Sequence, residues 1–235
     1  MLKATNIHKH YNELPILKGI DIEIHTKEVI CITGPSGAGK TTLLQILGSL
    51  DQPDKGEIVI DGVNINQLRG KKLAKFRNNN LGFIFQFHQL LPEFTAVENV
   101  IIPAILGGRS KSQSIEKAKK TLDYLGLSHR LEHKPAQLSG GEQQRVAVAR
   151  AMINDPAIIF ADEPSGNLDS KNSNELHQLF FQLKEEHNQT FVIVTHNQEL
   201  ADMADRKLEM KDGLLLPELN QAPTSKVDFS SFEQE

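Results

Sequence analysis

One stretch of eight residues constrains the fold of this chain more than any other. It matches the pattern G-x-x-x-x-G-K-[ST] and consists of Gly34, Pro35, Ser36, Gly37, Ala38, Gly39, Lys40 and Thr41. The continuous apolar run of residues 29–32 precedes it, and leucines at helical spacing follow it. This order predicts a buried strand, a tight turn and the first turn of a helix.

The chemistry of this turn indicates phosphate binding. Glycines let the backbone point consecutive N–H groups at phosphate oxygens, and the N-terminus of a helix adds a favourable field for an anion. We expect these eight residues and Thr42 to bind the phosphates of a nucleotide. In that arrangement Lys40 reaches the β- and γ-phosphates, and the Thr41 hydroxyl ligates Mg²⁺.

Buried strands alternate with helical segments along the chain. Three continuous apolar runs are typical of strands buried on both faces, and they lie at residues 29–32, 157–161 and 191–194. Residues 20–24 alternate between isoleucine and polar side chains, which predicts a half-buried strand. Residues 115–125 and 146–152 have apolar side chains at helical spacing. We therefore expect an α/β fold with a mostly parallel sheet and a helical insertion at about residues 88–150.

Composition and charge exclude several other classes of protein. A chain of 235 residues with 39% hydrophobic and 24% charged residues fits one large globular domain or a domain with an insertion. Its 26 basic and 30 acidic residues give a net charge of −4, so no global field favours nucleic acid or an anionic membrane. A single cysteine, Cys31, excludes a disulfide framework. No apolar run approaches the ~18 residues of a membrane-spanning helix, and the first residues lack the apolar segment of a signal peptide, so we expect a cytosolic protein.

Acidic residues follow the second apolar run, at Asp162 and Glu163. A carboxylate at the end of a parallel strand beside a phosphate loop is placed to hold Mg²⁺, which is the role expected for Asp162. Glu163 is expected to orient the attacking water and to act as general base. His196 follows the third run and is expected to contact the γ-phosphate and to hold the geometry of Glu163 and the water. The alternative is that Asp162 and Glu163 are simply solvated at the end of a strand. The phosphate loop elsewhere in the chain favours the functional interpretation.

A second glycine turn lies about a hundred residues after the first, at Ser139, Gly140, Gly141 and Glu142. Ser139 and Glu142 have the spacing of a helix capping box, which explains both residues but not the two glycines between them. Adjacent glycines at a helix N-terminus expose backbone N–H groups, so this turn is interpreted as a second anion site.

The combination of two anion sites and a paired carboxylate resembles the ATP-binding subunits of ABC transporters over nearly all of residues 1–215. The resemblance implies a RecA-like P-loop NTPase core with an antiparallel β-subdomain and a helical subdomain, spanning residues 1–216, before a C-terminal tail at 217–235. It also implies ATP and Mg²⁺ as ligands and ATP hydrolysis as the activity. In this family two copies sandwich two ATP molecules between the phosphate loop of one and the Ser-Gly-Gly turn of the other.

Further residues match the family's motifs one by one. Tyr11 matches the aromatic residue that stacks on adenine. Gln86 matches the glutamine that contacts Mg²⁺ or the γ-phosphate and couples the site to the membrane subunits. Residues 166–169 resemble the loop that crosses to the partner copy. Gln143 and Ser165 depart from the arginine and threonine that are frequent at these positions.

Residues 83–100 are most similar to the ATP-binding subunits of lipoprotein-releasing systems. This similarity implies a peripheral protein on the cytoplasmic face of the inner membrane, recruited by integral-membrane permease subunits. A macrolide-exporter-like or cell-division-type complex is the alternative. The apolar side chains of Phe87, Leu90, Leu91 and Phe94 either dock a partner helix or pack inside the helical insertion.

Other functions are less consistent with these motifs. The basic run at residues 69–77 is interpreted as a solvated helix face and not as a nucleic-acid or lipid contact. A soluble translation-factor-like ATPase would carry two cassettes, and a small-molecule kinase has no use for the Ser-Gly-Gly turn. A scaffold that binds ATP without hydrolysing it is disfavoured by the presence of both Glu163 and His196.

Overall fold

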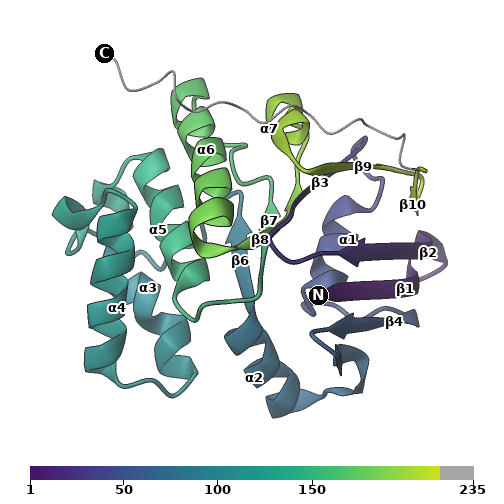
Figure 1. Ribbon diagram of the computed structural model, residues 1–235, viewed down its shortest axis with the longest axis horizontal. Coiled ribbons are helices and arrows are strands. Elements are labelled where there is room, and N and C mark those ends of the chain that lie inside the picture. Colours follow the sequence, from purple (N-terminus) through teal and green to yellow (C-terminus); the bar gives the residue numbers. More distant parts are fainter. Residues whose placement is uncertain (218–235) are drawn as a thin grey trace.

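Two sheets of different construction form the framework of the molecule, which was obtained as a computed structural model (Figure 1). The structure describes residues 1–217, so the tail expected at 217–235 lies almost wholly outside the described residues. The strands are β1 (Leu2–Tyr11), β2 (Leu14–Ile24), β3 (Val29–Thr33), β4 (Lys55–Ile60), β5 (Val63–Asn64), β6 (Leu81–Phe85), β7 (Ile158–Asp162), β8 (Thr190–Val194), β9 (Arg206–Lys211) and β10 (Leu214–Leu215). The helices are α1 (Lys40–Leu47), α2 (Gly70–Asn80), α3 (Ala96–Leu106), α4 (Lys111–Tyr124), α5 (Gly140–Met152), α6 (Ser170–His187) and α7 (Gln198–Met203).

The larger sheet has the strand order β10-β9-β3-β8-β7-β6 in the described part of the chain, and its strands from β9 to β6 pair in parallel. Its central strands separate two apolar clusters. In β3, Val29 and Cys31 face one cluster, whereas Ile30 and Ile32 face the other. Burial on both faces explains why these strands read as continuous apolar runs and not as alternating ones. The predicted strands at residues 29–32, 157–161 and 191–194 are confirmed.

The smaller sheet is antiparallel, with the order β2-β1-β4-β5 (Figure 1). Helix α1 contacts β2 as well as β7 and β8, so it lies between the two sheets. Leu43, Leu44, Ile46 and Leu47 of this helix are buried in the same cluster as the inward-facing residues of β1. The helix that follows the phosphate loop is therefore fixed on both sides.

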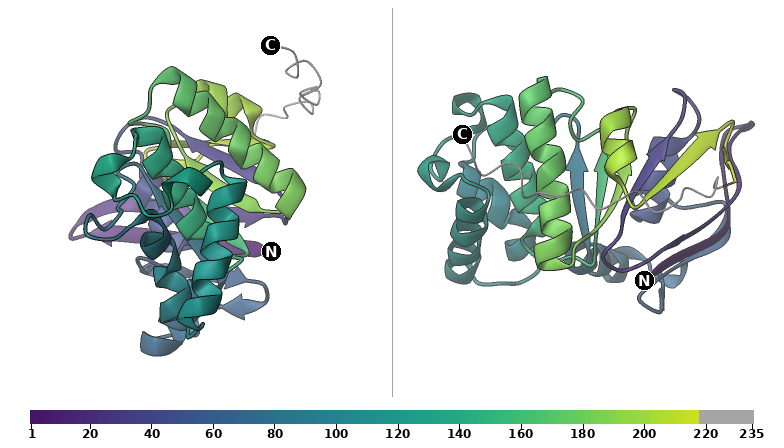
Figure 2. Two further views of the ribbon diagram at one scale, coloured as in Figure 1. Left: turned by 90° about the vertical axis from the view of Figure 1, so that its left-hand side faces the viewer. Right: turned by 45° about the horizontal axis from the view of Figure 1, so that its top comes forward.

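Helices cover the other face of the larger sheet. Helices α5, α6 and α7 contact β6, β8 and β3, and α3 and α4 pack against α5. Figure 2 shows α3, α4 and α5 gathered at one end of the molecule and the antiparallel sheet at the opposite end. The expected α/β fold, with a P-loop core, an antiparallel sheet and a group of inserted helices, is confirmed. Within residues 1–217, none of the helices combines the length and hydropathy that crossing a bilayer requires.

Candidate active site

The phosphate loop connects the carboxyl end of β3 to the first turn of α1. Gly39 caps α1 with a φ of 100°, and Gly34 has a φ of 138°. A Cβ atom at Gly34 would overlap the carbonyl group of Met210, so only glycine fits at this position. The Lys40 ammonium group donates to the carbonyl oxygens of Gly34 at 2.8 Å and Pro35 at 3.0 Å, which holds it across the loop.

A cavity of about 490 Å³ lies over this loop. Its lining comes from the loop, from the start of α1 and from the ends of β7 and β8, and includes Ser36, Lys40, Thr41, Thr42, Glu163 and His196. The volume is in the range of small-ligand sites in proteins. The parallel sheet thus brings Glu163 and His196 to the phosphate loop, although more than a hundred residues separate them from it in sequence.

Oxygen ligands for a cation lie at the end of β7. Asp162 Oδ1 accepts a hydrogen bond from Thr41 Oγ1 at 3.3 Å. Burial raises the pKa of Asp162 above its usual value, the negative charge of Glu163 adds to this, and the Thr41 hydrogen bond and Lys40 oppose it. A hydroxyl and a carboxylate in contact provide the hard oxygen donors that Mg²⁺ prefers, so the residues fit this ion.

Glu163 and His196 form a contact pair beside the phosphate loop. Glu163 has a φ of 47°, and its backbone N–H donates to the Val194 carbonyl at 2.9 Å, so the chain turns sharply after Asp162. Its Oε2 atom lies 2.9 Å from His196 Nδ1 and accepts from the His196 backbone N–H at 3.2 Å. The His196 side chain is 73% exposed, against 19% for Glu163. The carboxylate is held while the imidazole stays open to the cavity.

Gln86 follows β6 and is paired with the loop after Glu163. Its side-chain Nε2 donates to Asn167 Oδ1 at 3.3 Å, and Asn167 Nδ2 donates to the Gln86 carbonyl at 3.0 Å. Gln86 does not line the cavity over the phosphate loop. Its expected contact with Mg²⁺ or the γ-phosphate stays a prediction.

The Ser-Gly-Gly turn begins α5 away from the cavity over Lys40. Ser139 Oγ accepts from the Glu142 backbone N–H at 3.3 Å, and Glu142 Oε2 accepts from the Ser139 backbone N–H at 2.7 Å, so the capping box is confirmed. The other Glu142 oxygen accepts from Arg130 Nε at 2.7 Å. A Cβ atom would fit at Gly140, because it would lie 3.6 Å from its nearest neighbour, Leu168. One chain therefore presents two separate glycine turns, each at the start of a helix.

Tyr11 ends β1 near the phosphate loop, with 47% of its surface exposed. Its hydroxyl donates to Asp51 Oδ2 at 3.0 Å. Burial, followed by the hydrogen bond to Asp51, raises the pKa of Tyr11, and the Thr42 side chain lowers it slightly. Tyr11 is therefore a donor close to the start of α1.

Sequence reasoning missed several contacts that support this site. His177 on α6 is 1% exposed, and its Nε2 lies 3.0 Å from Ser165 Oγ. Gln144 on α5 donates to the Pro164 carbonyl at 2.7 Å. Both contacts hold the segment directly after Glu163. A histidine or glutamine on an apolar helix face indicates a buried polar contact. The sequence does not identify the partner, because in each case the partner lies outside the helix.

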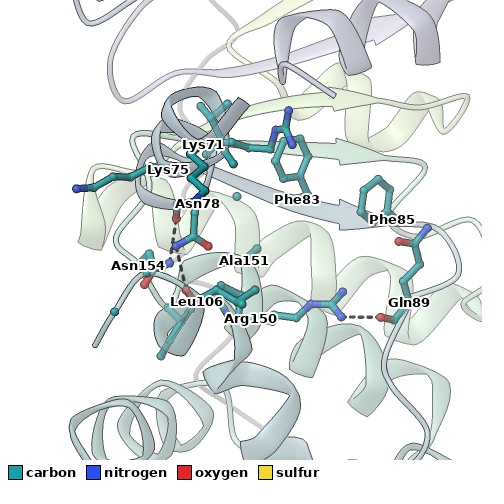
Figure 3. Close-up of a pocket in the computed structure, with 18 residues that line it drawn as sticks. Lys71, Lys75, Asn78, Phe83, Phe85, Gln89, Leu106, Arg150, Ala151 and Asn154 are labelled. Carbon is teal, nitrogen blue, oxygen red and sulfur yellow. Dashed lines mark hydrogen bonds between the residues drawn. The ribbon is translucent and has the colours of Figure 1, made fainter. Parts of the chain in front are cut away.

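A second and larger hollow, of about 800 Å³, lies between α2, β6, α3 and α5 (Figure 3). Figure 3 labels several of its lining residues, among them Lys71, Lys75, Phe83, Phe85, Gln89, Leu106 and Arg150. Arg150 donates to the carbonyl groups of His88 and Gln89, at 2.6 Å each. These two residues have φ values of 51° and 50°, so the arginine fixes an unusual backbone just after Gln86.

The apolar segment after Gln86 divides between two environments. Leu90 packs against the core. Phe87, Leu91 and Phe94 are exposed, by 74%, 43% and 40%. Internal packing is therefore confirmed for Leu90, whereas docking by the exposed residues of the segment stays a prediction.

Comparisons with known proteins agree with this geometry. A family profile described as ABC transporter matches residues 17–166. The lipoprotein-releasing system ATP-binding protein LolD of Cytophaga hutchinsonii is 59% identical over 216 residues, which are 92% of this chain and 99% of that protein. The protein of the same name from Bacteroides thetaiotaomicron is 57% identical over 215 residues, again 92% and 99% of the two chains.

Solved structures show the same arrangement of elements. The dimeric ABC transporter cassette MJ0796 matches with a TM-score of 0.85 and 41% identity, over 93% of this chain and 98% of that chain. The dimeric post-hydrolysis state of that cassette, bound to ADP and Pi, matches with a TM-score of 0.84, the same identity and the same coverage.

Proposed function

This chain belongs to the ABC transporter family, and on that premise we propose that it powers a membrane complex that releases lipoproteins. It is an ATP hydrolase of that family. The observation that carries the finer proposal is the identity of 57–59% to lipoprotein-releasing ATP-binding proteins over almost their whole length. Both relatives named above are lipoprotein-releasing proteins, which favours this function over the macrolide-exporter-like and cell-division-type alternatives.

The residues of the cavity divide the work of hydrolysis. The backbone N–H groups of residues 36–41 and the Lys40 ammonium bind the β- and γ-phosphates and neutralise their charge. Thr41 and Asp162 would hold Mg²⁺, which would supply positive charge to offset the negative charge on the phosphate oxygens. Glu163 accepts a proton from the attacking water and orients it in line with the leaving group. His196 fixes that carboxylate through the 2.9 Å contact.

A second copy completes each site. Gly141 is buried, whereas Ser139 and Gly140 are exposed at the start of α5 and lie outside the cavity over Lys40 in the same chain. We propose that they bind the γ-phosphate held by the partner copy. The dimeric state of the matching cassette MJ0796 supports this arrangement. Residues 166–169 are proposed to cross to the partner copy, and Gln86, which pairs with Asn167, is proposed to couple the site to the membrane subunits.

The expected test uses Glu163→Gln, which preserves the shape of the side chain and removes the base. The variant should retain ATP and form a dimer in size-exclusion chromatography with Mg-ATP, while turnover is lost. Glu175→Gln is the matched control, because Glu175 pairs with Arg145 on the helical side and touches no cavity residue. A Glu163→Gln variant that remains monomeric and hydrolyses ATP would contradict the proposal.

Membrane subunits are proposed to dock at the hollow of Figure 3. Phe85 and Gln89, which flank Gln86 and the exposed Phe87 in the sequence, line this hollow together with Lys71 and Lys75. An amphipathic cytoplasmic segment of a permease fits such a surface. This docking places the chain at the cytoplasmic face of the inner membrane, associated with it only through the partner.

Co-purification from detergent-solubilised membranes tests the docking surface. Phe87→Ser should lose the bound membrane chains and keep the ATP affinity of the isolated subunit. Leu214→Ser, which changes an exposed apolar residue on β10, should keep them. Equal retention by both variants would place the membrane partner elsewhere.

A further inference from the structure

A buried lysine lies at the end of β1, close to the proposed nucleotide site. Lys9 is 8% exposed and continues the inward-facing positions of the strand, which are otherwise apolar. Its ammonium group donates to Asp51 Oδ1 at 2.9 Å and to the Gln52 carbonyl at 2.8 Å. Lysine is seldom buried so completely without a specific partner. The pair therefore requires an explanation beyond packing.

Asp51 joins this lysine to Tyr11. The Lys9 ammonium lies 2.9 Å from both carboxylate oxygens of Asp51, and Oδ2 also accepts from the Tyr11 hydroxyl at 3.0 Å. The Lys9 ammonium also lies over the Tyr11 ring, 5.3 Å from its centroid. Burial pushes the pKa of Asp51 upward, but the hydrogen bonds from Lys9, the Gln52 backbone and Tyr11 bring it below its usual value, so Asp51 stays charged. Two contacts, one at the hydroxyl and one over the face of the ring, thus hold Tyr11 in position.

Asp51 is itself fixed to the helix that begins at the phosphate loop. The backbone N–H groups of Leu50 and Asp51 both donate to the Gln45 carbonyl in α1, at 2.7 and 3.2 Å. The opposite end of α1 begins at Lys40. The phosphate loop and the Tyr11 ring are therefore both connected to one short helix.

We propose that Lys9 and Asp51 are positioning residues that hold the Tyr11 ring as a preformed platform for the base of the nucleotide. The inference rests on the proposed nucleotide site, and neither residue touches the nucleotide in it. The ammonium covers one face of the ring, and a planar purine stacks on the face that remains. A ring fixed before binding loses little conformational entropy on stacking. Lys9 and Asp51 therefore increase the affinity for the base and do not change the affinity for the phosphates.

Two ligands separate these effects: ATP without Mg²⁺, which prevents turnover, and inorganic tripolyphosphate, which has no base. Calorimetric titration measures both dissociation constants. Tyr11→Phe removes only the hydroxyl, and Asp51→Asn leaves one acceptor oxygen for three donors, which are Lys9, Tyr11 and the Gln52 backbone N–H. Each should raise the Kd for ATP about three- to tenfold, because a ring that is ordered only on binding loses its conformational entropy at that step. The Kd for tripolyphosphate should change less than about twofold.

Asp54→Asn is the matched control. Asp54 lies three residues after Asp51 and contacts His10 on the same strand, but it does not touch the ring. This variant should keep the wild-type ratio of the two dissociation constants. The inference would be overturned if both Tyr11→Phe and Asp51→Asn left the ratio of the two dissociation constants unchanged, either because neither ligand binds more weakly or because both weaken equally.

Tyr11→Ala distinguishes this inference from the proposed site. If it raises the Kd for ATP alone while Asp51→Asn has no effect, the platform stands and only the positioning role fails. If Tyr11→Ala changes neither constant, the ring does not contact the base, and both the platform and the positioning role are wrong.

Discussion

Substitution of Ser139 by alanine separates the two roles assigned to the start of α5. The change removes one hydrogen bond of the capping box, from the Glu142 backbone N–H to Ser139 Oγ at 3.3 Å. The reverse bond at 2.7 Å remains, as does the contact of Glu142 with Arg130 at 2.7 Å. Loss of such a cap destabilises a protein by about 1 kcal/mol. For a domain of this size the melting temperature should fall by about 2–4 °C.

Catalysis should fall much further than stability. If the Ser139 hydroxyl binds the γ-phosphate of the partner's ATP, its loss removes a donor to the reacting group, which typically costs about a hundredfold in rate. ATP binding to the single chain should be unchanged, because Ser139 does not line the cavity over Lys40. Circular dichroism gives the melting temperature, equilibrium dialysis gives the Kd, and phosphate release gives kcat.

Ser110→Ala is the control for the capping role. Ser110 caps α4 and accepts from the Gln113 backbone N–H at the same distance, 3.3 Å, in the same group of helices. It should lower the melting temperature by a similar amount with kcat unchanged. A Ser139→Ala variant that behaves like Ser110→Ala in all three measurements would refute the second anion site and leave only a helix cap.

Two further perturbations probe backbone and titration. Gly34→Ala should abolish ATP binding in equilibrium dialysis, since its Cβ overlaps the Met210 carbonyl. Gly62→Ala is the control, because Gly62 has open space around it and lies outside the cavity; this variant should keep binding while losing about 1 kcal/mol from its φ of 77°. The reverse order would contradict this account. Burial lowers the pKa of His177 in the folded chain below its usual value. Below about pH 6.5 the unfolded chain therefore binds more protons than the folded chain, and the stability of the wild type falls from pH 7 to pH 5. His177→Phe should lose less stability over that interval in urea titrations, and an equal loss would show that this histidine is not responsible.

Local patterns were sufficient for the elements that bear the site. The apolar runs around the phosphate loop and before Asp162 predicted buried strands because both faces of the sheet are covered. The capping box at Ser139 was predictable because its two partners are three residues apart. In these cases the sequence spacing itself sets the contact.

Contacts between distant elements were not predictable in the same way. The pairing of Gln86 with Asn167 joins residues 81 positions apart, and that of Lys9 with Asp51 joins residues 42 apart. Which side chains meet across such separations depends on strand order and register, which a single sequence does not specify. Lys9, which lies among inward-facing apolar residues of β1, indicates a buried ion pair. The sequence does not show that its partner is Asp51.

The position of β3 ties this chain's function to the order of its synthesis. Val29 pairs with Phe191 of β8, and Ile30 pairs with Arg206 of β9. A ribosome must therefore release almost the whole chain before the strand that carries the phosphate loop gains either neighbour. Before β8 and β9 are synthesised, β3 has no paired strands to hold the phosphate loop in place. We therefore expect ATP to bind only to subunits in which these strands have been translated.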